Sequence, residues 1–147
     1  MPTAAKLVAT LALAVVAFAA SLALRAVLPD HIAAGRMVEV DTALGAAVGW
    51  LVMGRLAGRG YSAVVTLAVR SVAVLTFCAL MTFAIVEALE RAIALRYSDV
   101  MEALAGMVEL FGDYALILLT APLALATLLI GGVLAALLTE AVSRRWN

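Results

Sequence analysis

Long uncharged apolar stretches alternate with short polar ones along the chain, a pattern typical of membrane-spanning helices. Residues 7–24 contain no charged side chain, and a helix needs about 20 apolar residues to cross the roughly 30 Å hydrocarbon core of a bilayer. We predict a first span over residues 3–28, ended by Pro29, because proline disfavours helix in the residue before it. The alternative is a secretory signal, since Lys6 precedes the apolar run and small residues suitable for cleavage lie within it.

The second apolar stretch is shorter than the first. The uncharged part between Asp41 and Arg55 is too short to cross a bilayer alone. We therefore predict a span over residues 38–57, in which the long side chain of Arg55 reaches back to the membrane surface. The alternative is a buried segment that does not span.

Several glycines are spaced for close packing of helices. Pairs of small residues four apart share one helical face and allow two helix backbones to approach closely. The second span carries two such pairs, so we expect it to be the helix that packs most closely against its neighbours, and a glycine pair in the last span predicts another close contact. These glycines are Gly45, Gly49, Gly54, Gly58, Gly131 and Gly132.

The second half of the chain predicts two more spans joined by an amphipathic segment. Residues 62–86 form the third span, and an amphipathic extension over residues 87–113 leads to the last span, residues 114–142. Within the extension, Asp99 and Glu102 have the spacing of a helix-capping motif.

The last span contains Pro122, which predicts a kink. The chain, residues 1–147, is thus predicted to be one all-α membrane domain, a four-transmembrane-helix bundle with an amphipathic helical hairpin between helices 3 and 4.

Composition supports membrane insertion and excludes several classes of function. Hydrophobic residues make up 67% of the chain and charged residues 14%, with a mean hydropathy of +1.16, whereas soluble domains carry about 25% charged residues. The net charge of zero argues against a nucleic-acid-binding protein, which would be basic. With Cys78 and His31 as the single cysteine and the single histidine, we expect no catalytic centre, cofactor or metal site, and no enzyme.

The distribution of basic residues predicts the orientation. Four spans place both termini on one side of the membrane, and slightly more basic residues lie on that side, which the positive-inside rule assigns to the cytoplasm. We therefore expect a multi-pass protein of the bacterial inner (cytoplasmic) membrane with both termini cytoplasmic. The basic residues on the side of the termini are Lys6, Arg55, Arg59, Arg144 and Arg145, and those on the other side are Arg25, Arg36, Arg91 and Arg96.

Charged residues inside apolar spans are the candidate polar site. Arg70 lies within the third span, where a charge is costly and normally faces the bundle interior with a partner. Because side chains lean toward the helix N-terminus, we expect Arg70 to reach Glu140; the alternative is an arginine that extends to the membrane surface. Asp41 is either an interfacial residue or part of a polar site with Arg25 and Arg36 as neighbours.

Several separated motifs resemble the TrgA-like family of tellurite-resistance integral membrane proteins. They occur in the family's order along nearly the whole chain. Two positions depart from the family pattern: Arg70 stands where small polar residues are usual, and Val100 follows Asp99 where glycine is usual. The motifs are the N-terminal Met1-Pro2-Thr3-Ala4-Ala5-Lys6, Gly49-Trp50 with Met53-Gly54, Gly58-Arg59-Gly60-Tyr61, Arg96-Tyr97-Ser98-Asp99, and Gly131-Gly132 with Arg144-Arg145-Trp146.

The resemblance implies a small inner-membrane protein associated with tellurite resistance, without catalytic residues to carry over. We expect a non-catalytic accessory or interaction protein in the lipid bilayer that forms a homo-oligomer or joins a larger membrane-protein complex. The alternative is a small transporter or permeation path for an oxyanion, with Arg70, Arg55 and Arg59 as positive contacts.

Overall fold

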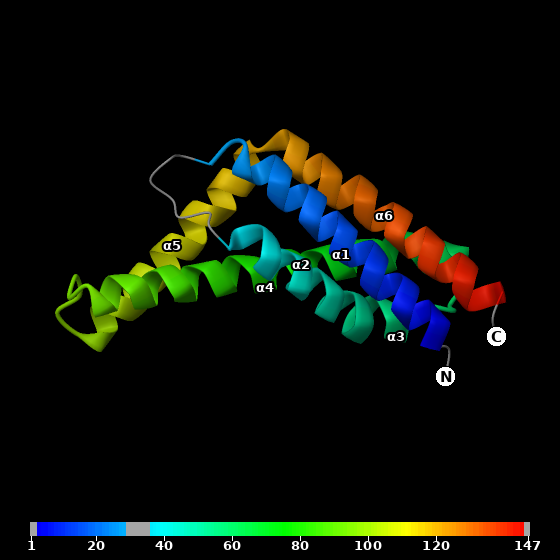
Figure 1. Ribbon diagram of the computed structural model, residues 1–147, viewed down its shortest axis with the longest axis horizontal. Coiled ribbons are helices and arrows are strands. Elements are labelled where there is room, and N and C mark those ends of the chain that lie inside the picture. Colours follow the sequence, from blue (N-terminus) through cyan, green and yellow to red (C-terminus); the bar gives the residue numbers. More distant parts are fainter. Residues whose placement is uncertain (1–2, 29–35, 146–147) are drawn as a thin grey trace.

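The computed structural model describes residues 3–28 and 36–145, and in these ranges all regular secondary structure is helical. Five helical stretches are long and apolar enough to cross a membrane, which indicates a multi-pass membrane protein. The elements are α1 (Thr3–Arg25), α2 (Met37–Val48), η1 (Gly49–Met53), α3 (Gly54–Leu56), η2 (Tyr61–Ala63), α4 (Val64–Ile93), α5 (Val100–Thr120) and α6 (Pro122–Arg145) (Figure 1).

The helices form a bundle from which one hairpin extends. Helix α1 packs against α6 on one side and α2 on the other, and the first half of α4 completes the bundle. Helix α1 begins and α6 ends at the same end of the molecule, whereas α5 and the second half of α4 extend past the opposite end of α1 (Figure 1).

Where the sequence predicted a short second span over residues 38–57, the structure has a continuous helical stretch from Met37 to Leu56. Its middle section, η1, is a π-helix, a local widening that inserts one extra residue into a turn. Met53, at the end of η1, is completely buried, and its sulfur lies 3.6 Å from the Thr139 hydroxyl, which donates to the Ala135 carbonyl oxygen at 2.7 Å. Met53 and Thr139 therefore bring the C-terminal end of the second span into contact with α6.

The hairpin turn between α4 and α5 has the predicted cap. The Asp99 carboxylate accepts a hydrogen bond from the Glu102 backbone N–H at 2.7 Å, and the Glu102 carboxylate accepts one from the Ser98 backbone N–H at 2.7 Å. These two bonds satisfy backbone donors that the first turn of a helix leaves free. The prediction of a helix start at Asp99 is confirmed.

The path after Asp99 differs from the predicted one. We expected an amphipathic segment ending at residue 113 and a kinked span over residues 114–142, whereas α5 runs unbroken to Thr120 and a separate helix, α6, starts at Pro122. Ala121 between them has a non-helical backbone, with φ −101° and ψ 82°. Proline has no N–H to donate and excludes helical geometry from its predecessor, so the helix ends here instead of bending. The structure thus has five helices of membrane-spanning length in the described ranges, where the sequence predicted four spans.

The molecule has a large core in the bundle and a small one in the hairpin. The bundle core consists mainly of alanine, leucine and valine from α1, α4 and α6, among them Leu13, Ala68 and Ala136. The hairpin core contains Ala84, Ala88 and Leu110, with larger side chains packed partly against it. Small residues in both cores let the helices approach closely.

Candidate functional site

A buried carboxylate on α2 faces α1 near the start of the second helical stretch. Asp41 belongs to the buried face of α2 and is 8% exposed. The hydroxyl of Ser21, itself 2% exposed on α1, donates a hydrogen bond to Asp41 Oδ2. Gly45 lies one turn further along α2, where a Cβ atom would come within 2.7 Å of the Ala17 Cβ. The absence of a side chain at Gly45 thus brings the two helices close enough for Ser21 to reach Asp41.

The second carboxylate oxygen of Asp41 has no hydrogen-bond partner in the described part of the chain. The expected basic neighbours, Arg25 and Arg36, are both exposed and form no salt bridge with Asp41, so that expectation is wrong. A charged group removed from water is costly unless it is paired. Asp41 therefore presents one unsatisfied acceptor inside the bundle.

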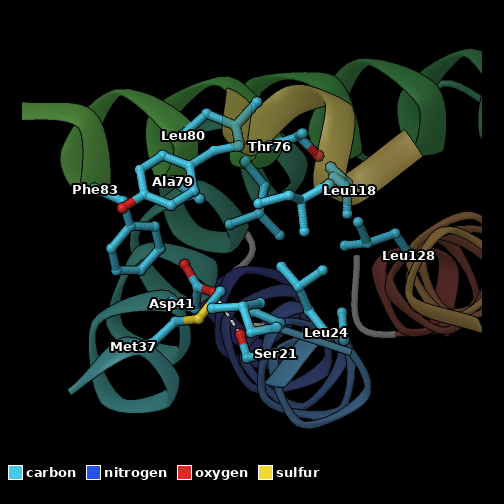
Figure 2. A pocket seen from close by; sticks show the side chains of 16 residues that line it. Ser21, Leu24, Met37, Asp41, Thr76, Ala79, Leu80, Phe83, Leu118 and Leu128 are labelled. Atoms are coloured by element: carbon cyan, nitrogen blue, oxygen red, sulfur yellow. Dashed lines mark hydrogen bonds between the residues drawn. The ribbon is translucent and has the colours of Figure 1, made fainter. Parts of the chain in front are cut away.

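Asp41 lines a cavity of about 80 Å³. Figure 2 shows Asp41 and Ser21 on one side of the cavity, facing Thr76, Leu118 and Leu128 across it. All five long helices contribute to its wall, which is mostly aliphatic and includes no lysine, arginine or histidine among the described residues. The cavity is therefore apolar, with a single acidic group.

Two aromatic rings form part of the cavity wall. Phe83 from α4 and Tyr114 from α5 pack edge to face, with ring centroids 6.5 Å apart and an interplanar angle of 65°. The faces of aromatic rings carry a partial negative charge that attracts cations. Tyr114 thus lines the cavity together with Phe83.

A second buried carboxylate lies at the opposite end of the bundle. Glu140 on α6 is 1% exposed and accepts hydrogen bonds from the backbone N–H groups of Gly58 at 2.7 Å and Gly60 at 2.8 Å. Gly58 and Gly60 have φ values of +91° and +96°, which side-chain-bearing residues rarely adopt. The turn wraps its N–H groups around the carboxylate, as backbone anion-binding turns do. Glu140 therefore holds the connection between α3 and η2 against α6.

The predicted pair of Arg70 with Glu140 does not form. Arg70 is exposed on α4, beside the buried face that includes Leu67, Ser71 and Leu75. Across the described residues, the salt bridge found joins Arg91 to Glu87. Because Arg70 lies about two turns from the start of α4, its long side chain can extend to the membrane surface along the outside of the bundle. The structure therefore favours the alternative reading of Arg70.

The remaining glycines singled out by the sequence lie at close helix contacts. A Cβ on Gly49 would collide with the backbone of α1 at Ala9 and Thr10, and one on Gly54 would come within 2.9 Å of the Lys6 Cα. In α6, Gly131 faces Val16 and Gly132 faces Val72. Through these two neighbours, α6 packs against both α1 and α4.

Sequence reasoning missed Ser21, Phe83 and Tyr114 as parts of one site. A serine in an otherwise apolar run was the available signal for Ser21.

Cys78 is half-buried in α4, while His31 and Trp146 lie outside the described residues. In residues 3–28 and 36–145, no three histidine, cysteine or acidic side chains lie close enough to hold a metal ion. The geometry at Asp41 is suited to binding a ligand by charge and apolar contact.

Comparisons with protein-family models, with curated proteins and with solved structures give no match to this chain. The resemblance to the TrgA-like family therefore stays a prediction that rests on the sequence motifs.

Proposed function

We propose that this chain is a four-pass protein of the bacterial inner membrane with both termini cytoplasmic. In this arrangement α1, the stretch from Met37 to Leu56, the first part of α4, and α6 cross the bilayer. Helix α5 and the second part of α4 form a hairpin beyond it.

Helix lengths and charge support this arrangement. Helices α1 and α6 contain 23 and 24 residues, which at about 1.5 Å per residue matches a bilayer core of roughly 30 Å. Helix α4 contains 30 residues, so about 15 Å of it would project. The hairpin also carries exposed acidic side chains at Asp99, Glu102, Glu109 and Asp113, which are unfavourable in lipid.

In this arrangement the protein serves as a non-catalytic accessory subunit that docks on a larger membrane-protein complex through its hairpin. One observation carries this proposal: each helix of the hairpin exposes a row of large apolar side chains that neither core covers. Ile93 is 75% exposed and Val108 67% exposed. Outside the hydrocarbon, such a surface is stable when a partner protein covers it. Members of the two rows are Leu89, Ile93, Val100, Met101, Leu104 and Val108.

A direct oxyanion path is the weaker candidate. Its proposed positive contacts, Arg55, Arg59 and Arg70, are all exposed. The cavity inside the bundle is lined by an acid and by no basic residue of the described chain, so it would repel an anion. We therefore propose that any contribution to tellurite resistance is indirect, through the partner complex.

Affinity purification of the tagged chain from native membranes in mild detergent, followed by mass spectrometry, tests the accessory role. We expect a stoichiometric membrane-protein partner that is lost in Val108→Lys, because a charge in the apolar row disrupts docking. Glu109→Lys is the matched control, since it places the same charge on the adjacent exposed position outside the row. Recovery of the wild-type chain as a free monomer contradicts the proposal. Recovery of a homo-oligomer without another protein also contradicts it and favours the transport alternative.

A further inference from the structure

We propose that the cavity at Asp41 binds a small organic ammonium cation, with the carboxylate as its counter-ion and the Phe83 and Tyr114 rings against its apolar substituents. This site is independent of the accessory role proposed for the hairpin. It is built from residues of all five long helices.

Charge is the first argument for this ligand. Asp41 lines the cavity and is more than nine-tenths buried, and one of its carboxylate oxygens has no partner among the described residues. Buried charges in proteins are normally paired or bound to an ion. The neighbouring hydroxyl of Ser21 is already committed to the other oxygen. A cation in the cavity would complete the coordination of Asp41.

The chemistry of the wall selects an organic cation over a metal ion. Ca²⁺ and Mg²⁺ require about six or more oxygen ligands, and the cavity offers Asp41, Ser21, Thr76 and the Tyr114 hydroxyl amid aliphatic side chains. An ammonium group with apolar substituents fits both parts of the lining, and aromatic rings are the surfaces that recognise such groups.

Size and depth restrict the ligand further. A cavity of about 80 Å³ is smaller than the engineered void of about 150 Å³ that accommodates benzene, so the ligand has only a few heavy atoms, as tetramethylammonium does. Asp41 lies about one turn after the start of α2, and Ser21 about one turn before the end of α1. At this depth the cation can come from a free amine or from the amine headgroup of a lipid.

The test uses the full chain purified in an uncharged maltoside detergent and titrated with tetramethylammonium chloride by isothermal calorimetry. We expect saturable binding that sodium chloride and tert-butanol, an uncharged molecule of similar size, do not reproduce. Asp41→Asn should weaken the affinity by about tenfold or more, since it removes a close opposite charge. Glu109→Gln, which neutralises an exposed acid on α5, should bind as the wild type does.

A second variant tests the cavity separately from the acid. Ala79→Leu places extra side-chain volume in the cavity wall while leaving Asp41 intact, so it should also abolish binding. Absence of saturable binding to the wild type overturns the proposal, as does wild-type affinity in both Asp41→Asn and Ala79→Leu.

Reconstitution then distinguishes the two sources of the amine. Native mass spectrometry from nanodiscs of phosphatidylethanolamine and phosphatidylglycerol should show whether the amine lipid is retained. Retention by the wild type but not by Asp41→Asn assigns the site to a lipid headgroup. Binding of tetramethylammonium that phosphatidylethanolamine does not weaken assigns it to a free amine.

Discussion

Two carboxylates are buried in this bundle, at opposite ends, and they are satisfied very differently. Glu140 receives two backbone hydrogen bonds, from Gly58 and Gly60, one to each of its oxygens. Asp41 receives one from the Ser21 hydroxyl, its other oxygen has no partner in the described chain, and the residue lines a cavity. A fully bonded buried acid holds the fold together, whereas a half-bonded acid beside a cavity is available to a ligand.

Removing the Glu140 carboxylate should have the largest effect on stability. Glu140→Ala removes the charged acceptor of the Gly58 and Gly60 N–H groups and so two charge-assisted hydrogen bonds, which we expect to lower the free energy of unfolding by about 3 kcal/mol. Glu140→Gln, which keeps one carbonyl oxygen, should lose less. Denaturant titration of the chain in detergent micelles measures both values. Equal stability of Glu140→Ala and the wild type would show that the carboxylate does not hold the turn.

The close approach of α2 to α1 links the Asp41 end to the rest of the bundle. In Gly45→Ala the new methyl group meets Ala17 and the Leu13 carbonyl oxygen at 2.7 Å, so we expect a loss of about 1–3 kcal/mol from overpacking. Gly112→Ala is the matched control, because a Cβ there meets nothing within 4 Å; it should stabilise α5 slightly through helix propensity. The same unfolding titration compares the two variants. A similar effect of both would mean that the glycine at 45 is not required for close packing.

Neutralising Asp41 should change stability less than neutralising Glu140 does, and in the opposite direction. In the empty protein, Asp41→Asn removes an incompletely paired buried charge, so we expect a gain of up to about 1 kcal/mol. Thermal unfolding of Asp41→Asn and Glu140→Gln under identical conditions checks the difference in sign. A large destabilisation by Asp41→Asn would indicate that both acids have the same structural role.

Arg70 should have the smallest effect. Because it is exposed on the outer side of α4, Arg70→Leu is expected to change the free energy of unfolding by less than about 0.5 kcal/mol. Tellurite tolerance of cells that express the variant at equal membrane abundance should also be unchanged. Loss of tolerance in these cells would restore Arg70 as a functional cation and favour the oxyanion path.

Local pattern predicted the features that depend on neighbours in sequence. The cap at Asp99 follows from the spacing of two side chains along one turn. The glycines at 45 and 49 share a helical face whichever helix they meet, and in the structure they meet α1. Only a kink was predicted at Pro122, whereas the helix breaks at Ala121. The signal for this break was present in the sequence, because proline disfavours helical geometry in the residue before it.

The sequence by itself determined that this chain is helical, apolar and suited to a membrane, because hydropathy and helical periodicity are properties of single segments. Tertiary structure decided which polar residues meet. Arg70 and Glu140 are charged residues within apolar stretches, yet helix rotation directs Arg70 outward and places Glu140 over a glycine turn. Rotation and register depend on how all the helices pack together, and the cavity at Asp41 exists only where five of them converge.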